Sequence, residues 1–430
     1  MKSFFSLLTC AVVSVAITLT VVLFSGCGSI ERQNYAITES SFSGKTFPFV
    51  YIDVDNGQEI LSKEEYLPCS VRITNTDDEW VLDGENTQTA NVKGRGNSSW
   101  AMPKKSYKLK FESKINLFGF GKAKKYNLIA NYCDKSLSRN LMAYELARTI
   151  GLSETSSTQP VNLMVNNEYY GVYLLCEQNE IGKSRVNIES DLAKVNTGYL
   201  LEIDARANQE GVLGVDYFTI DGINYVLKDP ESDDEGFTTE HFSFIQSYVQ
   251  NCYNALNGSY EGVLDLIDVQ SFAKCYLIHE LFNTVDVGYS SFYIYKKGAK
   301  LYAGPVWDFD VSSGNCNYNA AANATNYMQA KIANVWYNKL TVFQDFKAIV
   351  KDLINDYYDI INEKIDDVVA YQMEYEDNNI ANFEVWQIMG RYVWPNPIEI
   401  FDISTFSGQL EYLQNWLKAK LDYMKVVYCN

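Results

Sequence analysis

The chain has 430 residues, an apolar share of 47% and 32 tyrosines. This apolar content is sufficient for a packed core, so global disorder is excluded. The formal net charge of −18 argues against sequence-independent binding of nucleic acid. His241 and His279 are the only histidines in the sequence, which disfavours a His-built zinc site and a Ser-His-Asp triad.

The charge is distributed unevenly along the sequence. Residues 91–150 contain thirteen basic and three acidic residues, a local net charge of +10. Outside this segment and the first 27 residues, the chain carries a net charge of −29. One cationic segment in an acidic chain predicts a local anion site, and a solvated lysine-rich face is the alternative.

The first 27 residues predict export from the cytoplasm. Lys2 is followed by an apolar run from Phe4 to Phe24 and then by small residues, which is typical of a lipoprotein-type export signal. Cys27 resembles the acylated cysteine of a bacterial lipobox. An uncleaved transmembrane helix is the alternative, because the run is about long enough to span a bilayer. Both interpretations predict an extracytoplasmic protein anchored to the bacterial cell membrane.

A polar tether is expected at residues 28–45, followed by a β-rich segment. Periodicity predicts strands at 47–53, 70–74, 90–95 and 106–111. A helix is expected at 134–150, with Asp134 as its N-cap. Hairpins are predicted at Asn166-Asn167 and Asp221-Gly222, with another strand at 198–204.

The pattern becomes mostly helical after about residue 237. Helices are predicted at 238–256, 268–283, 342–369 and 406–427, and a strand pair is predicted at 291–310. The sequence therefore predicts an α+β fold with a β-rich lobe at 46–236 and a helix-rich lobe at 237–430. The two lobes are expected to pack tightly because no Pro-rich linker separates them.

Three aspartates are predicted to meet at the open end of the 291–310 hairpin. A turn at either Lys297-Gly298 or Gly298-Ala299 brings Asp286 close to Asp308 and Asp310, with the last two on one strand face. Clustered carboxylates suit Mg²⁺, and one of them could orient or deprotonate a nucleophile. The alternative is that these aspartates cap loops.

A glycine-containing basic segment lies earlier in the chain. The sequence KGRGNSSW at 93–100 is followed by PKKSYKLKF at 103–111. Glycines permit close approach of the backbone to phosphate, and a lysine on the next strand can meet the phosphate charge. A tight turn with surface lysines is the alternative. A nucleotide with Mg²⁺ bridging this segment and the aspartates would match the division of labour in protein kinases, although the HRD motif is missing.

Four segments together resemble the spore coat protein H (CotH) kinase family. They are 93–111, NYCDKSLSRN at 131–140, NNEYYGVYLLCEQ at 166–178, and GPVWDFDVSSGN at 304–315. The resemblance implies a bilobal atypical protein-kinase-like fold that binds ATP with Mg²⁺ or Mn²⁺. In characterised members of the family, the activity is phosphorylation of serine in proteins.

The resemblance also implies roles for individual residues. By position they are a catalytic aspartate at Asp286, metal ligands at Asp308 and Asp310, a phosphate-contacting lysine at Lys110 with a carboxylate partner at Glu177, and a glycine-loop residue at Arg95. Family members commonly carry Asn shortly after the position of Asp286, where this chain has the sequence VGYSS at 287–291.

The sequence therefore predicts an ATP- and Mg²⁺-dependent protein Ser/Thr kinase at the cell surface, with a protein substrate and no nucleic-acid partner. Two alternatives use the same residues differently. One is a non-catalytic surface protein that binds glycan or protein, an interpretation favoured by 32 Tyr, 22 Phe and 7 Trp. The other is a metal-dependent phosphohydrolase, in which water replaces the protein hydroxyl as acceptor.

Overall fold

The computed structural model describes residues 30–74 and 87–429 of the chain. The predicted export signal at 1–27 and its Cys27 lie outside these residues. Within the described part, no helix combines the length and the apolar character needed to cross a membrane.

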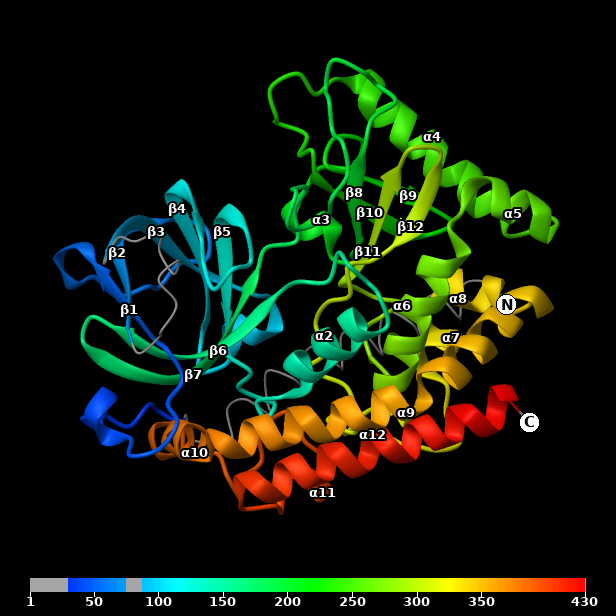
Figure 1. Ribbon diagram of the computed structural model, residues 1–430. Coiled ribbons are helices and arrows are strands. Elements are labelled where there is room, and N and C mark those ends of the chain that lie inside the picture. The colour runs from blue at the N-terminus through cyan, green and yellow to red at the C-terminus, as the bar shows by residue number, and fades with distance from the viewer. Residues whose placement is uncertain (1–29, 75–86, 430) are drawn as a thin grey trace, which may run out of the picture.

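The N-terminal part of the described chain forms a closed seven-stranded barrel in the order β1-β2-β3-β4-β5-β7-β6 (Figure 1). Neighbouring strands are antiparallel except for β1 and β6, which close the barrel as a parallel pair. Strand alternation on β4 turns Tyr107, Leu109 and Phe111 into the barrel core and leaves Lys108 and Lys110 on the outside. The strands are β1 Phe49–Val54, β2 Leu67–Thr74, β3 Gln88–Arg95, β4 Ser106–Asn116, β5 Lys122–Ile129, β6 Thr158–Val165 and β7 Glu168–Glu177.

A second, five-stranded sheet has the order β12-β11-β8-β10-β9. Its strands are β8 Tyr199–Ile203, β9 Tyr217–Ile220, β10 Ile223–Asp229, β11 Phe292–Lys297 and β12 Lys300–Ala303. Every residue of β8 is buried, and β8 pairs with β10 on one side and β11 on the other. Strands from both sides of residue 236, where the sequence predicts the boundary between the two lobes, therefore share one sheet.

Helices pack against the two sheets and cover them. Helix α6 is buried along almost its whole length, as a central helix should be. Helices α9 and α12 run side by side beneath the rest of the fold (Figure 1). The helices are α2 Arg139–Thr149, α3 Ala207–Glu210, α4 Thr239–Ala255, α5 Tyr260–Leu266, α6 Val269–Phe282, α7 Gln329–Ala333, α8 Val335–Leu340, α9 Gln344–Glu374, α10 Glu376–Val385, α11 Ile398–Phe401 and α12 Phe406–Cys429.

The α+β class is confirmed, but several local predictions need correction. The expected helix at 134–150 begins only at Arg139, and Asp134 lies in the preceding turns. Strand β5 was not predicted, because its lysines obscure the strand alternation. The hairpin turns at Gly298-Ala299, since Lys297 pairs with Lys300. Strand β12 ends at Ala303, so the strand face expected to carry Asp308 and Asp310 does not exist.

The expected tether at 28–45 is also corrected for its described residues. Residues 30–47 lie against the barrel and α10, and Ile37, Phe42 and Phe47 join a shared hydrophobic cluster. The Phe47 ring stacks on Tyr375 with centroids 4.3 Å apart. The backbone N–H of Phe47 donates to Asn378 Oδ1 at 3.1 Å. This segment therefore joins the barrel to the helical layer.

Replacing Phe47 with Ala tests this packing. Phe47 is fully buried, so Phe47→Ala is expected to lower the free energy of unfolding by about 3–5 kcal/mol in urea titrations. Tyr35→Ala is the control, since that ring is 46% exposed and should cost well under half as much. Equal stability of Phe47→Ala and the native protein would contradict the packing of Phe47 between the barrel and the helical layer.

Candidate functional site

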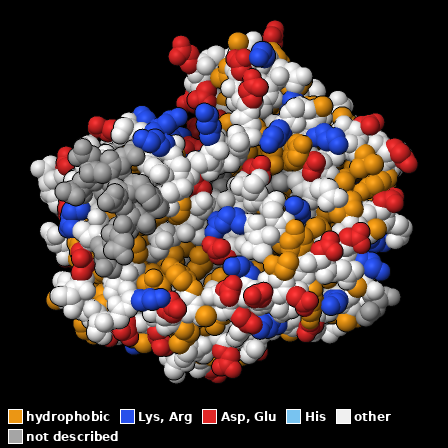
Figure 2. Space-filling model, in the orientation of Figure 1, with side chains coloured by type: hydrophobic (Ala, Val, Ile, Leu, Met, Phe, Trp, Pro, Cys, Tyr) orange, Lys and Arg blue, Asp and Glu red, His pale blue; other side chains and the backbone are white. Residues whose placement is uncertain are grey.

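A cleft of about 620 Å³ lies between the barrel and the second sheet. This volume is within the usual range for small-molecule sites. Its walls come from β3 and the loop after it, from β4, β8 and β10, and from the loops around residues 286–291 and 307–311. Most of the lining side chains are charged or polar. Figure 2 shows Lys and Arg side chains beside Asp and Glu side chains where the barrel meets the second sheet.

Asp286, Asp308 and Asp310 all line this cleft. The structure thus brings together the three aspartates that the predicted strand pair at 291–310 was expected to place close to one another. Asp308 has a left-handed backbone with φ of 68°, and Ser291 has a φ of 61°. Ser291 Oγ donates to Asp308 Oδ2 at 3.0 Å, which ties the two loops together at the positions where the backbone is strained.

Burial and the charge of Asp308 raise the pKa values of Asp286 and Asp310. Burial, followed by the charge of Asp308, raises the pKa of Asp286 to about 6, and Arg206 partly opposes this change. Burial and then Asp308 raise the pKa of Asp310 to about 8, and Asp134 adds to the rise. Like charges held close together disfavour ionisation, so a cation bound beside these carboxylates would favour their ionised forms.

These carboxylates fit a hard divalent cation. Mg²⁺ commonly takes one or two carboxylates and completes its shell with water and substrate phosphate. Among residues 30–74 and 87–429, no group of three or more His, Cys, Asp or Glu side chains is arranged to hold a metal ion by itself. A cation at Asp308 and Asp310 would therefore depend on oxygen atoms brought by a ligand.

The cleft lining also includes cationic side chains. Arg95, Lys108 and Lys228 are among them, from β3, β4 and β10 respectively. Arg95 lies 5.5 Å from the ring centre of Trp307, and Lys228 Nζ lies 3.1 Å from Glu202 Oε2. Burial, and then nearby cations with Lys125 first, lower the pKa of Lys108 to about 8. A polyanionic ligand would relieve this repulsion.

Two residues with predicted roles lie elsewhere. Lys110 is exposed and outside the cleft lining, while Lys108, two residues earlier on the same strand face, lines the cleft. Glu177 is buried and does not pair with Lys110. Its carboxylate lies 3.5 Å from Arg185 Nε and accepts from the backbone N–H of Ser157 at 2.9 Å. The geometry instead offers Lys228 and Glu202 as a lysine–glutamate pair in the cleft.

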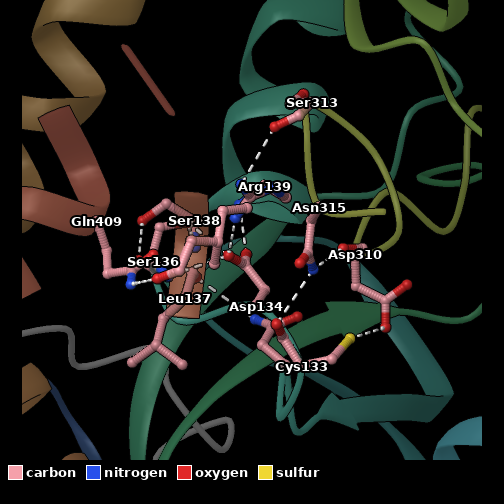
Figure 3. A network of polar contacts seen from close by, with 12 residues as sticks. Cys133, Asp134, Ser136, Leu137, Ser138, Arg139, Asp310, Ser313, Asn315 and Gln409 are labelled. Atoms are coloured by element: carbon pink, nitrogen blue, oxygen red, sulfur yellow. Dashed lines mark hydrogen bonds and ion pairs between the residues drawn. The ribbon is translucent and has the colours of Figure 1, made fainter. Parts of the chain in front are cut away.

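The segment 131–140 supports the Asp310 loop through a buried ion pair (Figure 3). The side chains of Asp134 and Arg139 are both fully buried and form a salt bridge. Arg139 Nε donates to the carbonyl of Ser312 at 3.1 Å, and its Nη2 donates to the carbonyl of Ser313 at 3.2 Å. The sequence marked this segment only by its family resemblance, because nothing local indicates that these charges are buried.

Neighbouring side chains complete the support of the same loop. Asn140 Oδ1 accepts from the backbone N–H of Phe309 at 2.8 Å. Asn315 Nδ2 donates to the carbonyl of Asp310 at 2.8 Å, and Cys133 Sγ lies 3.6 Å from Asp310 Oδ2. Asp310 is thus held through both its backbone and its side chain.

The loop that carries Asp286 is held from the helical layer. Gln329 Nε2 donates to the carbonyl of Val285, and Asn334 Nδ2 donates to that of Val287, each at 2.8 Å. A Cβ at Gly288 would lie 1.9 Å from the carbonyl oxygen of Ala333, so only glycine fits there. The position of Asp286 therefore depends on α7 and α8, which lie more than forty residues away in sequence.

Comparison with known families gives one match. The family model described as CotH kinase protein matches residues 92–424, which is more than three quarters of the chain. The match includes both walls of the cleft, from Arg95 to Asp310. No curated protein matches the chain.

The buried ion pair can be tested by Arg139→Met. This change leaves Asp134 as an unpaired buried charge and is expected to cost about 3–5 kcal/mol in the free energy of unfolding, measured in urea. Arg148→Met is the matched control, since Arg148 lies on the same helix and pairs with Glu145 at the surface. The control should cost about 1 kcal/mol or less. Similar losses in both variants would contradict the assigned role of the buried pair.

Asp310→Asn tests the electrostatics of the site. Because the pKa of Asp310 is raised to about 8, the native state binds more protons than the unfolded state between about pH 4 and 8. This group therefore lowers the free energy of unfolding as pH rises through that range. In urea titrations from pH 5 to 8, Asp310→Asn is expected to gain stability relative to the native protein as pH rises. Parallel curves for the two proteins would refute this.

Proposed function

The chain belongs to the CotH kinase protein family, and we propose that it transfers the γ-phosphoryl group of ATP, with Mg²⁺ or Mn²⁺, to serine or threonine in a protein substrate. One observation carries this proposal. Three cationic side chains, Arg95, Lys108 and Lys228, and three aspartates line a single cleft of nucleotide size. Phosphoryl transfer depends mainly on positioning and on stabilising charge, which is what such an arrangement supplies.

The three cationic side chains would hold the phosphates. Arg95 offers a planar guanidinium beside the glycine loop, and Lys108 and Lys228 offer point charges from neighbouring walls. Glu202 would keep Lys228 in position through their ion pair. Lys110 is not assigned this role, because it lies outside the cleft lining.

Asp286 would act on the acceptor hydroxyl. Its pKa of about 6 lets the carboxylate be ionised at neutral pH and still accept a proton. In this step the hydroxyl oxygen attacks the γ-phosphorus, its proton passes to Asp286, and the bond to the ADP oxygen breaks. Arg206 would favour the ionised form of Asp286 before the reaction.

Asp308 and Asp310 would hold the divalent cation, which would neutralise negative charge on the phosphates. Ser291 lies five residues after Asp286, the spacing at which protein kinases place a metal-binding Asn. Its hydroxyl already contacts Asp308. We assign Ser291 to holding Asp308 in place, as a neutral oxygen where the kinase pattern has an amide.

The cellular setting is proposed from the sequence. The apolar N-terminal run would anchor the protein outside the cytoplasm, through a lipid on Cys27 or through an uncleaved helix. The barrel and the second sheet would form the two walls of a bilobal kinase-like site. The substrate would then be a protein exposed at the same surface.

Nucleotide binding and transfer test the proposal. ATP with Mg²⁺ is expected to raise the melting temperature of the purified protein, and ATP with a chelator should not. Asp308→Asn should abolish this rise, whereas Lys300→Ala, a change on the distant β12, should leave it intact. Labelled γ-phosphate should appear on protein. Free phosphate without labelled protein would indicate a phosphohydrolase. The absence of both ATP-induced stabilisation and label transfer would refute the proposal.

Ser291 has a distinct expected effect. Ser291→Ala removes the hydrogen bond to Asp308 and should raise the Mg²⁺ concentration needed for half-maximal ATP-induced stabilisation several-fold. Ser291→Asn restores a polar oxygen and should recover most of the loss. Ser98→Ala is the control, since Ser98 also lines the cleft. Unchanged Mg²⁺ dependence in Ser291→Ala would contradict the role assigned to Ser291.

A further inference from the structure

Four lysines lie side by side on the outer face of the barrel, next to the cleft. We call them the lysine strip: Lys93 on β3, Lys108 and Lys110 on β4, and Lys125 on β5. The antiparallel register places Lys93 directly opposite Lys108, and Lys110 directly opposite Lys125. Like charges directly opposite each other on paired strands are destabilising. The fold therefore carries two unfavourable pairs in adjacent positions.

Little in the described structure compensates for these charges. Lys125 Nζ lies 3.6 Å from a carboxylate oxygen of Glu180. Lys93 and Lys110 lie 4.9 and 5.8 Å from the ring centre of Tyr66, which offers a weak cation–π attraction. Among residues 30–74 and 87–429, no carboxylate lies within ion-pair distance of Lys108. Among the described residues, the one ion pair made by the strip is therefore that of Lys125 with Glu180.

The lysine strip extends from the cleft lining onto the outer face of the barrel. Lys93 and Lys108 belong to the cleft lining, whereas Lys110 and Lys125 lie beyond it. If the phosphates of ATP occupy Arg95, Lys108 and Lys228, as the proposed function requires, the outer two lysines remain available to another anionic group. That group would lie close to the reacting phosphate.

We propose that the lysine strip binds an acidic segment of the protein substrate, rich in Asp, Glu or phosphorylated residues, and so selects acidic substrates. This inference rests on the proposed function. The strip crosses three strands, about 10 Å, which suits a few residues of extended peptide. Glu112 follows Lys110 on the same face of β4 and limits the strip in that direction.

The size and surroundings of the strip favour a short peptide over a nucleic acid. The whole chain has a net charge of −18, so most of its surface repels anions. Charges separated by more than about 8 Å are largely screened at physiological salt, which lets a local cationic strip act on its own. A long polyanion would extend beyond the strip into acidic surroundings, whereas a short acidic segment would not.

A binding measurement without ATP tests the strip directly. A fluorescent peptide with one serine among Asp and Glu residues is expected to bind the purified full-length protein, as followed by anisotropy. A peptide of equal length with Lys in place of the acids should not bind. The double variant Lys110→Glu/Lys125→Glu should weaken binding of the acidic peptide by at least about tenfold, because both attractions become repulsions.

The matched control is Lys297→Glu/Lys300→Glu, which reverses another directly opposed lysine pair at the tip of the second sheet. It should leave peptide binding unchanged. Equal binding by the strip variant and the native protein would overturn the inference. Equally tight binding of a single-stranded oligonucleotide of the same charge would overturn it too.

ATP binding separates this inference from the proposed function. The strip variant should keep its stabilisation by ATP with Mg²⁺, measured relative to its own melting temperature without ATP, because Lys110 and Lys125 lie outside the cleft lining. Loss of ATP-induced stabilisation would assign the strip to the nucleotide site and overturn the inference. Acidic-peptide binding without any label transfer would refute the proposed kinase activity and leave the strip assignment standing.

Discussion

The repulsion among Asp286, Asp308 and Asp310 is the constraint on which the rest of the site depends. Asp308 opposes the ionisation of Asp286 and Asp310, and these carboxylates stay together only if their loops cannot move apart. The Asp310 loop is fixed by the buried Asp134–Arg139 pair and by amide side chains, and the Asp286 loop is fixed by Gln329 and Asn334. Much of the buried polar network therefore serves to hold unfavourable charges in place.

The same principle applies to the cationic side chains of the cleft. Lys108 is surrounded by other cations, and directly opposed lysines continue across the outer face of the barrel. Both sets of side chains line one cleft, where Lys228 is paired with Glu202 and Arg206 partly offsets the charge at Asp286. An anionic ligand with a divalent cation would reduce the repulsion within both sets. Functional sites commonly retain such unfavourable arrangements because the surrounding fold stabilises them.

The second sheet makes this arrangement possible. Strand β8 pairs with a strand from the earlier part of the chain and with one from the later part, so the sheet joins what the sequence separates. Glu202 on β8 and Lys228 on β10 then share a cleft with the loop that follows β12. Residues 30–47 add a further connection, from the barrel to α10.

The sequence alone determined the α+β class and most strands and long helices, because these follow from local periodicity. The three aspartates line one cleft as expected, but loops carry them there, not the strand face that the hairpin register predicts. Local signals could not decide which of Lys108 and Lys110 faces the cleft, since both lie on the same side of β4 and only the neighbouring sheet distinguishes them. Nor could they show that Asp134 and Arg139 are buried, or that Glu177 pairs with Arg185. Those outcomes depend on contacts between distant segments, and only the tertiary structure decided them.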